Sequence, residues 1–281
     1  MTAGRKRIAI ALGDANGIGP EIAVKAAFAL RDEPVDCVLV GDGFVLQELL
    51  VCHAPGMSLT AFVPGVQRHP DQLLWANVAA LPPSEYVPGE VRAAAGAAMV
   101  AYVREAVRLA RSGAVDAVVG CPHSETSVAR AGIPFSGYPG LIAQLTGASL
   151  DRVFLVLVSP ELKIGHVTLH ESVRTALGRL DTQLVVDAAL ATIEGARMIG
   201  IHRPRLGVFG INPHAGENGL FGDEDQAITE PAVARLRAMG LDVDGPQGAD
   251  LMLAQRRHDV YLAMFHDQGH IPVKLLSPRQ A

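Results

Sequence analysis

Short runs of β-branched and other apolar residues alternate along this chain with longer stretches of amphipathic, helical spacing. The runs of strand length cover residues 7–12, 37–40, 115–120, 153–158, 164–169, 206–211 and 260–265. The helical stretches between them include residues 20–30, 90–111, 182–199 and 230–239. This alternation predicts a largely parallel sheet that is covered by helices on both faces. We therefore expect an α/β fold.

The chain is long enough for two lobes. With 281 residues, of which 49% are hydrophobic and 19% charged, it can bury a full core. We place the boundary within Pro134–Pro139, which gives an N-terminal α/β lobe over residues 1–135 and a second α/β lobe over residues 136–281. The segment Pro64–Pro88 is rich in proline and polar residues, so we expect it to be irregular.

Charge and cysteine content argue against several classes of protein. The net charge is −5 and no stretch is rich in Lys and Arg, which disfavours a nucleic-acid or anionic-membrane partner. The three cysteines are scattered, so neither a disulfide framework nor a thiolate zinc site is expected. The apolar run near the N-terminus is short and reads as a first strand, not as a signal peptide. No apolar segment is long enough to span a bilayer, and we expect a soluble cytoplasmic protein.

Three predicted strands end on a histidine: His170, His214 and His266. The carboxyl ends of strands form the crevice where ligands bind in open α/β sheets. Three imidazoles at that edge would suit one divalent cation such as zinc, cobalt, nickel or iron, with zinc our first expectation. His166 lies four residues before His170, but on a strand the two would be too far apart to act together, so we take only His170 as a ligand. The alternative is that each histidine is simply structural.

Other polar residues lie near these histidines in the sequence. Lys274 follows His266 by eight residues and would supply a fixed positive charge to a substrate carboxylate or a developing enolate, unless it only snorkels. Asp250 and Asp267 are candidate proton acceptors or partners of the histidines, or alternatively helix caps and turn residues.

Two loops after predicted strands have less specific patterns. Gly13–Glu21 is glycine-rich but lacks the spacing of the dinucleotide fingerprint, so it is equally a structural turn or a ligand-contacting loop, and we assign no cofactor-binding residues. The pair Cys121 and His123 resembles a nucleophile and its base. Because no third, orienting group is evident, we prefer to interpret this segment as a loop.

Taken together, these segments resemble the 4-hydroxythreonine-4-phosphate dehydrogenase family over essentially the whole chain. The matching segments are Gly-Asp-x-x-Gly-Ile-Gly-Pro-Glu, Arg-Ala-Gly-Ile-Pro-Phe-Ser-Gly, Thr-Leu-His170, Asn-Pro-His214-Ala-Gly-Glu, Gly-Pro-x-x-Ala-Asp250 and His266-Asp267-Gln-Gly. The resemblance implies that the three histidines bind the metal and that Asp250, Asp267 and Lys274 contact the substrate. It also implies a fold like isocitrate and isopropylmalate dehydrogenases, NAD bound without a Rossmann fingerprint, and a homodimer whose active site is shared between subunits.

The chain departs from the family pattern where the substrate phosphate is held. A His-Thr pair of the family is replaced by Tyr138-Pro139, and a lysine by Ser124. Losing these donors disfavours a phosphorylated substrate, whereas a tyrosine suits a flat ring. We assign Tyr138 and His123 to substrate binding. The runs Cys-Pro-His-x-Glu-Thr, Phe-Ser-Gly-Tyr-Pro and His-Asp-Gln-Gly-His-Ile-Pro resemble most the terephthalate dihydrodiol dehydrogenase branch of the family.

The resemblance implies an NAD- and metal-dependent oxidative decarboxylation of a cis-dihydrodiol dicarboxylate to protocatechuate and carbon dioxide. The alternative within the family is a dehydrogenase of a 4-phosphorylated hydroxy acid such as 4-hydroxythreonine 4-phosphate. A catalytically silent, metal-stabilised oligomer and a metal-free α/β protein remain open as different classes. The family continues for several dozen residues beyond the lysine, whereas this sequence ends at Ala281. Either the sequence is part of a longer chain, or this form lacks part of the NAD site.

Overall fold

The computed structural model describes residues 5–135 and 137–278. They form two compact units, Met1–Gly147 and Ala148–Ala281, each with its own sheet and core. The boundary that the sequence suggested, after residue 135, falls before α5 (Tyr138–Thr146), which belongs to the first unit. The reason is local packing, because the Tyr138 ring covers Gly120 of the first sheet.

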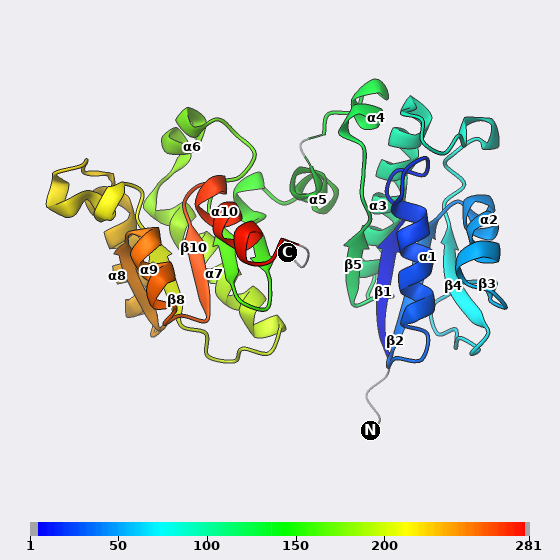
Figure 1. The fold of residues 1–281 in the computed structure, drawn as a ribbon, viewed down its shortest axis with the longest axis horizontal. Coiled ribbons are helices and arrows are strands. Elements are labelled where there is room, and N and C mark those ends of the chain that lie inside the picture. The colour runs from blue at the N-terminus through cyan, green and yellow to red at the C-terminus, as the bar shows by residue number, and fades with distance from the viewer. Residues whose placement is uncertain (1–4, 136, 279–281) are drawn as a thin grey trace. The chain divides into compact units, whose positions relative to one another are not determined.

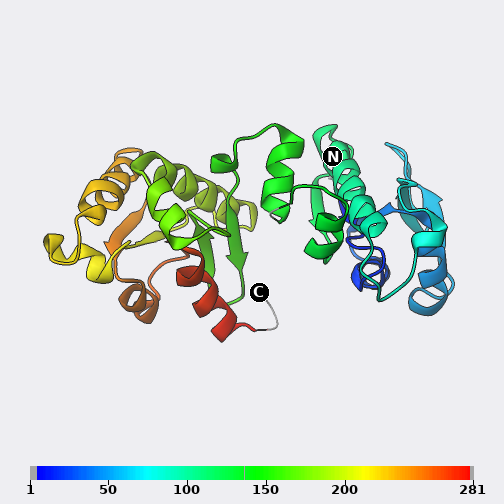
Figure 2. The ribbon, with the colours of Figure 1, turned by 90° about the horizontal axis from the view of Figure 1, so that it is seen from above.

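The first unit contains a five-stranded sheet in the order β3-β4-β2-β1-β5, in which all neighbouring strands are parallel. Its strands are β1 (Lys6–Ala11), β2 (Val35–Gly41), β3 (Ser58–Ala61), β4 (Gln72–Asn77) and β5 (Ala117–Gly120). Its helices are α1 (Gly19–Ala29), α2 (Gly43–His53), α3 (Ala93–Arg111), α4 (Glu125–Arg130) and α5, with a short 3-10 turn at Pro83–Glu85. Figures 1 and 2 show α1 and α3 on opposite faces of this sheet, which buries the apolar central strands as the alternating pattern predicts.

The second unit contains a mixed sheet in the order β6-β7-β10-β8-β9. Its strands are β6 (Leu155–Val158), β7 (Lys163–His166), β8 (Leu206–Phe209), β9 (Val243–Gln247) and β10 (Val260–Ala263). Only the β6–β7 pair is antiparallel among the strand pairs in the described residues. Its helices are α6 (Val173–Arg179), α7 (Thr182–Met198), α8 (Glu230–Ala238), α9 (Ala249–Gln255) and α10 (His266–Leu276). Shorter turns lie at Leu150–Arg152, Pro213–Gly219 and Asp225–Thr229.

Each face of the second sheet carries its own core. Residues of α7 and α8 pack with Val208 and Leu262 on one face. Residues of α9 and α10 pack with Phe209 and Tyr261 on the other. Because consecutive strand residues point to opposite faces, β8 and β10 must be apolar throughout, and every residue of both strands is buried. Figure 1 shows α10 lying against this sheet beside β10.

The predicted fold class, α/β with mostly parallel sheets and covering helices, is confirmed. The prediction that 64–88 is irregular is wrong in part, because β4 lies within this segment and pairs with both β2 and β3. The predicted strand over 164–169 is shorter, and β7 ends at His166. In the part of the chain that the structure describes, no helix is long and apolar enough to cross a bilayer.

Candidate active site

Two of the three predicted ligands, His170 and His266, lie side by side at one edge of the second sheet. Their ring centroids are 5.2 Å apart, with the rings tilted by 49°. His266 is the first residue of α10, immediately after the β10 strand and its short extension. The loop that carries His170 stays alongside β10 because the backbone N–H of Thr168 donates to Met264 O and its hydroxyl donates to the same oxygen at 2.7 Å.

The His266 ring is held by its neighbour in the sequence. The Nδ1 atom of His266 lies 2.7 Å from Oδ1 of Asp267, so Nδ1–H donates a hydrogen bond to the carboxylate, which favours the tautomer whose lone pair is at Nε2. Thus Asp267 has the contact expected of a partner of a metal-binding imidazole. A cavity of about 440 Å3 opens here, lined by His170, His266 and Asp267 together with Glu171. The exposed His170 and the half-buried His266 on this cavity wall can bind a cation or a substrate hydroxyl.

Two further histidines form a chain behind His266. The His270 ring stacks on that of His266 at 3.7 Å, and its Nδ1 lies 3.2 Å from Nε2 of His166 and 3.1 Å from His266 O. His166 is fully buried, and its Nδ1 lies 3.3 Å from Leu155 O. Carbonyl oxygens only accept, so both Nδ1 atoms carry the proton and the lone pair of His270 is at Nε2. Burial, with the neighbouring His270 as a lesser cause, lowers the pKa of His166 to about 4.

Sequence reasoning set His166 aside and did not consider His270. The signal that was available is the spacing of His266 and His270, four residues apart, which places both on one side of a helix. The sequence analysis predicts no helix after residue 265, whereas α10 begins at His266 itself.

His214 is exposed and lies in an unusual turn. Residues 214–218 all have positive φ values, between 45° and 81°, although only one of them is glycine. Left-handed backbone costs about 1–2 kcal/mol per non-glycine residue, and such strain is concentrated at functional sites. The start of this loop is fixed by the fully buried Asp225, whose carboxylate accepts from the backbone N–H groups of Ile211 and Asn212 at 2.8 and 2.9 Å.

The His214 ring lies beside Phe221, with 6.1 Å between the centroids. Over residues 5–135 and 137–278, no group of three or more His, Cys, Asp or Glu side chains is placed to hold a metal ion. The donor chemistry of His170 and His266 fits a divalent metal.

Asp250 and Lys274 lie on different helices of this unit. Asp250 is exposed in the first turn of α9, beside Gly248, which in turn lies close to the His214 backbone. Lys274 is exposed on α10, one turn after His270, whose pKa it helps to lower in addition to the effect of burial. Gln268 connects two strand ends, because its amide donates to Gly210 O at 2.9 Å and accepts from Met264 N at 2.8 Å.

His123 and Tyr138 meet in the first unit, after β5. Three rings make edge-to-face contacts, with centroids 4.8 Å apart for His123–Tyr138 and 4.9 Å for His123–Phe135. The Tyr138 hydroxyl donates to Cys121 O, and burial raises the pKa of Tyr138 to about 12. The tyrosine therefore offers its ring and not a free hydroxyl. Burial raises the pKa of Cys121 to about 11, which speaks against a cysteine nucleophile.

The glycine-rich loop after β1 packs against the Cys121 segment. A Cβ atom at Gly13 would lie 2.1 Å from Pro122 O, and the backbone N–H of Asp14 donates to that oxygen. The amide of the buried Asn16 donates to Glu85 O and accepts from Val87 N. These contacts explain Gly13, Asp14 and Asn16 as parts of a structural turn.

A family profile described as "Pyridoxal phosphate biosynthetic protein PdxA" matches residues 33–281. The chain is 47% identical over 284 residues to the 1,2-dihydroxy-3,5-cyclohexadiene-1,4-dicarboxylate dehydrogenase of Comamonas sp, covering 100% of this chain and 86% of the relative. The crystal structure of a terephthalate 1,2-cis-dihydrodiol dehydrogenase from Burkholderia xenovorans LB400 is 48% identical, with a TM-score of 0.75, and the match covers 96% of this chain and 82% of that one. A 4-hydroxythreonine-4-phosphate dehydrogenase from Klebsiella pneumoniae is 37% identical, with a TM-score of 0.82 and coverages of 96% and 85%.

Proposed function

This chain belongs to the family of the pyridoxal phosphate biosynthetic protein PdxA, and we propose that it is an NAD- and divalent-metal-dependent dehydrogenase of a cis-dihydrodiol dicarboxylate. The proposed products are protocatechuate and carbon dioxide. The observation that carries the substrate class is the 47% identity, over the whole chain, to a relative named as a dehydrogenase of such a diol. The ring cluster at His123 and Tyr138 supports an aromatic-like substrate.

In this proposal His170, His214 and His266 hold the cation, with Asp267 orienting His266. A divalent cation bound there would act as a Lewis acid toward the hydroxyl and carboxylate oxygens of the substrate. NAD would accept the hydride from the secondary carbinol carbon. We also propose that the fold is like that of isocitrate and isopropylmalate dehydrogenases.

The protein side chains handle the protons and the developing charge. Asp250 or Asp267 takes the proton of the secondary hydroxyl as the hydride leaves its carbon, which gives a β-keto acid. The bond between the neighbouring carbon and its carboxylate then breaks, carbon dioxide departs, and the electron pair moves to the keto oxygen. Lys274 places its positive charge where that oxygen becomes negative. The ring becomes aromatic as carbon dioxide leaves, and protonation of the resulting phenolate oxygen gives the catechol.

Tyr138 and His123 are the residues that we assign to the ring of the substrate. The Tyr138 ring is fixed, because it lies over Gly120 and its hydroxyl is used by Cys121 O. A fixed ring and the edge of an imidazole favour a flat partner over a flexible, phosphorylated one.

We further propose a homodimer in which subunits share the active site. In the described part of one chain the three histidines form no group placed to hold a metal ion, and a partner subunit can provide the third imidazole. The free cysteines Cys37, Cys52 and Cys121 support a reducing, cytoplasmic location.

The test is turnover with defined substrates. The purified full-length protein, with zinc, manganese or cobalt added, is mixed with NAD and the diol dicarboxylate, and both NADH and carbon dioxide are measured. We expect one NADH and one carbon dioxide per protocatechuate formed. Substituting His170→Ala should abolish turnover, whereas His202→Ala, an exposed histidine of the same unit, should leave it unchanged.

The second candidate is a dehydrogenase of a 4-phosphorylated hydroxy acid, which the 37% identity to the Klebsiella enzyme favours. 4-Hydroxythreonine 4-phosphate is therefore run beside the diol in the same assay. Turnover of the phosphorylated acid alone would replace the diol assignment. Turnover of neither substrate, with metal and NAD both bound, would contradict both.

A further inference from the structure

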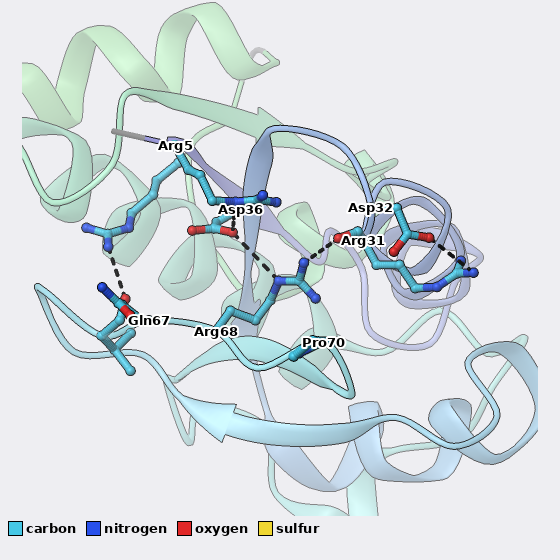
Figure 3. A pocket seen from close by; sticks show the side chains of 9 residues that line it. Arg5, Arg31, Asp32, Asp36, Gln67, Arg68 and Pro70 are labelled. Carbon is cyan, nitrogen blue, oxygen red and sulfur yellow. Dashed lines mark hydrogen bonds and ion pairs between the residues drawn. The ribbon is translucent and has the colours of Figure 1, made fainter. Parts of the chain in front are cut away.

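A second cavity, of about 600 Å3, lies in the first unit at the amino ends of its strands. It is lined by Arg5, which precedes β1, by Arg7 in β1, by Arg31 after α1 and by Arg68 in the β3–β4 connection, together with Asp32 and Asp36 (Figure 3). Because the strands are parallel, this end of the sheet is opposite to the carboxyl ends where Cys121 and His123 lie. The cavity therefore lies at the other end of this sheet from Cys121 and His123, and the residues that line it include none of those assigned to the active site.

Four arginines and two aspartates line this cavity. Asp36 pairs with Arg5 at 2.9 Å and lies 3.6 Å from Arg68, and Figure 3 shows the Arg68 guanidinium between Asp36 and Arg31. Asp32 pairs with Arg31 at 3.3 Å, but its side chain is 81% exposed, so this pair is screened by water. The excess of two positive charges stands out in a chain whose net charge is −5.

Most remaining contacts of these arginines are to backbone carbonyls. Arg5 donates to Val35 O at 3.0 Å, Arg7 to Val66 O at 3.0 Å and Arg68 to Gln72 O at 3.2 Å. A carbonyl accepts a hydrogen bond but carries no charge, so these contacts position the guanidinium groups without neutralising them. The Arg68 side chain is only 10% exposed, which makes the field of its charge stronger than at the surface.

Arg7 has one buried donor that the described chain does not satisfy. Its Nε atom is buried and has no hydrogen-bond partner in the described chain. Nor does its guanidinium form an ion pair with any described residue; it lies over the Phe62 ring at 5.9 Å. A buried donor without an acceptor is destabilising, and almost all such groups in proteins are satisfied by some partner.

We propose that this cavity binds a small dianion, whose oxygens accept from Arg7 and balance the two excess charges. The guanidinium fork binds a phosphate or a carboxylate equally well, in a bidentate way, so the ligand class is a phosphate or dicarboxylate oxyanion. The volume is within the range of small-molecule sites. Binding there would tie the β3–β4 connection to the start of β2 and so stabilise the first unit. This site is independent of the proposed dehydrogenase reaction.

Isothermal titration of the full-length protein tests the site, first with inorganic phosphate and then with succinate, at constant ionic strength made up with sodium chloride. We expect saturable binding with one anion per chain for at least one of the two probes. Arg7→Gln should weaken it by about tenfold or more, as expected for losing a charge-assisted donor pair. Arg203→Gln removes an exposed arginine of the other unit and should change nothing.

Two more variants keep the result interpretable. Arg7→Lys retains the charge without the fork and should fold even if Arg7→Gln does not, with binding weaker than in the unsubstituted protein. His170→Ala should bind the anion normally, because His170 is not among the residues that line the cavity. Absence of saturable binding for both probes, or equal binding by the Arg7 and Arg203 variants, would overturn the proposal. Loss of binding in His170→Ala would assign the anion to the active site and overturn it as well.

Discussion

His166 illustrates at the residue scale how one buried side chain organises several exposed ones. It is fully buried between Leu155 O and the His270 ring, and both contacts use a neutral imidazole. Burial lowers the pKa of His166 from an ordinary value of 6.5 to about 4. Its neutral state therefore sets which nitrogen of His270 carries the proton, and His270 stacks on the proposed ligand His266.

This pKa predicts how stability changes with pH. Between about pH 6.5 and pH 4, His166 binds a proton in the unfolded chain but not in the folded chain. The free energy of unfolding therefore falls as the pH falls through this window. We expect His166 alone to lower the free energy of unfolding by about 2 kcal/mol between about pH 7 and pH 5. Urea denaturation of metal-free His166→Gln should lack this part of the pH dependence, whereas His202→Gln should retain it. Equal slopes for the two variants would contradict the assignment.

Lys274 is predicted to act after hydride transfer. If its charge stabilises the negative oxygen that forms as carbon dioxide leaves, Lys274→Met should slow carbon dioxide release by about 100-fold or more. NADH formation should be affected less, so that a β-keto acid accumulates and can be trapped by borohydride. Lys25→Met, on the exposed face of α1, is the matched control. A purely structural Lys274 would lower both rates together or neither.

At the scale of elements, Gly269 allows α10 to pack close to β7. A Cβ atom at Gly269 would lie 2.2 Å from Nε2 of the buried His166, which cannot move without losing its contacts. Gly269→Ala should therefore destabilise the protein by about 1–3 kcal/mol. Gly178 in α6 has no atom within 4 Å of its Cβ position, so Gly178→Ala should stabilise by about 0.5–1 kcal/mol. Chemical denaturation measures both, and the same sign for the two changes would contradict the packing argument.

The same elements explain what the sequence alone could predict. Mostly apolar runs allowed β1, β2, β8 and β10 to be predicted, because a parallel strand that is buried on both faces has few polar residues. The strands β3, β4 and β9 were missed, since β3 is short, β4 lies within the proline-rich segment 64–88, and β9 (Val243–Gln247) contains glycine and proline. At the site, the sequence predicts that His170, His214 and His266 converge, and the structure places the rings of His170 and His266 5.2 Å apart. The helix α10 was not predicted, because its interior Pro272 argues against a helix and tertiary packing overrides that local preference.

At the scale of the whole molecule, the position of His214 predicts that subunits share their sites. If His214 of one subunit completes the His170 and His266 pair of another, His170→Ala and His214→Ala proteins are each inactive alone. A mixed dimer of the two would regain one intact site out of two, and so about half of the activity of the unsubstituted dimer. Co-expression with two affinity tags isolates the mixed dimer for the assay. A mixed dimer that stays inactive would place all three histidines within one subunit.

X-ray absorption at the zinc edge of the zinc-loaded, full-length protein tests the metal centre most directly, because it counts the imidazoles bound to the ion. Three imidazole nitrogens are predicted, falling to two in each of His170→Ala, His214→Ala and His266→Ala, with His202→Ala unchanged. A spectrum with fewer than three imidazoles in the unsubstituted protein, or one that His214→Ala leaves unaltered, would contradict the centre on which the proposed reaction depends.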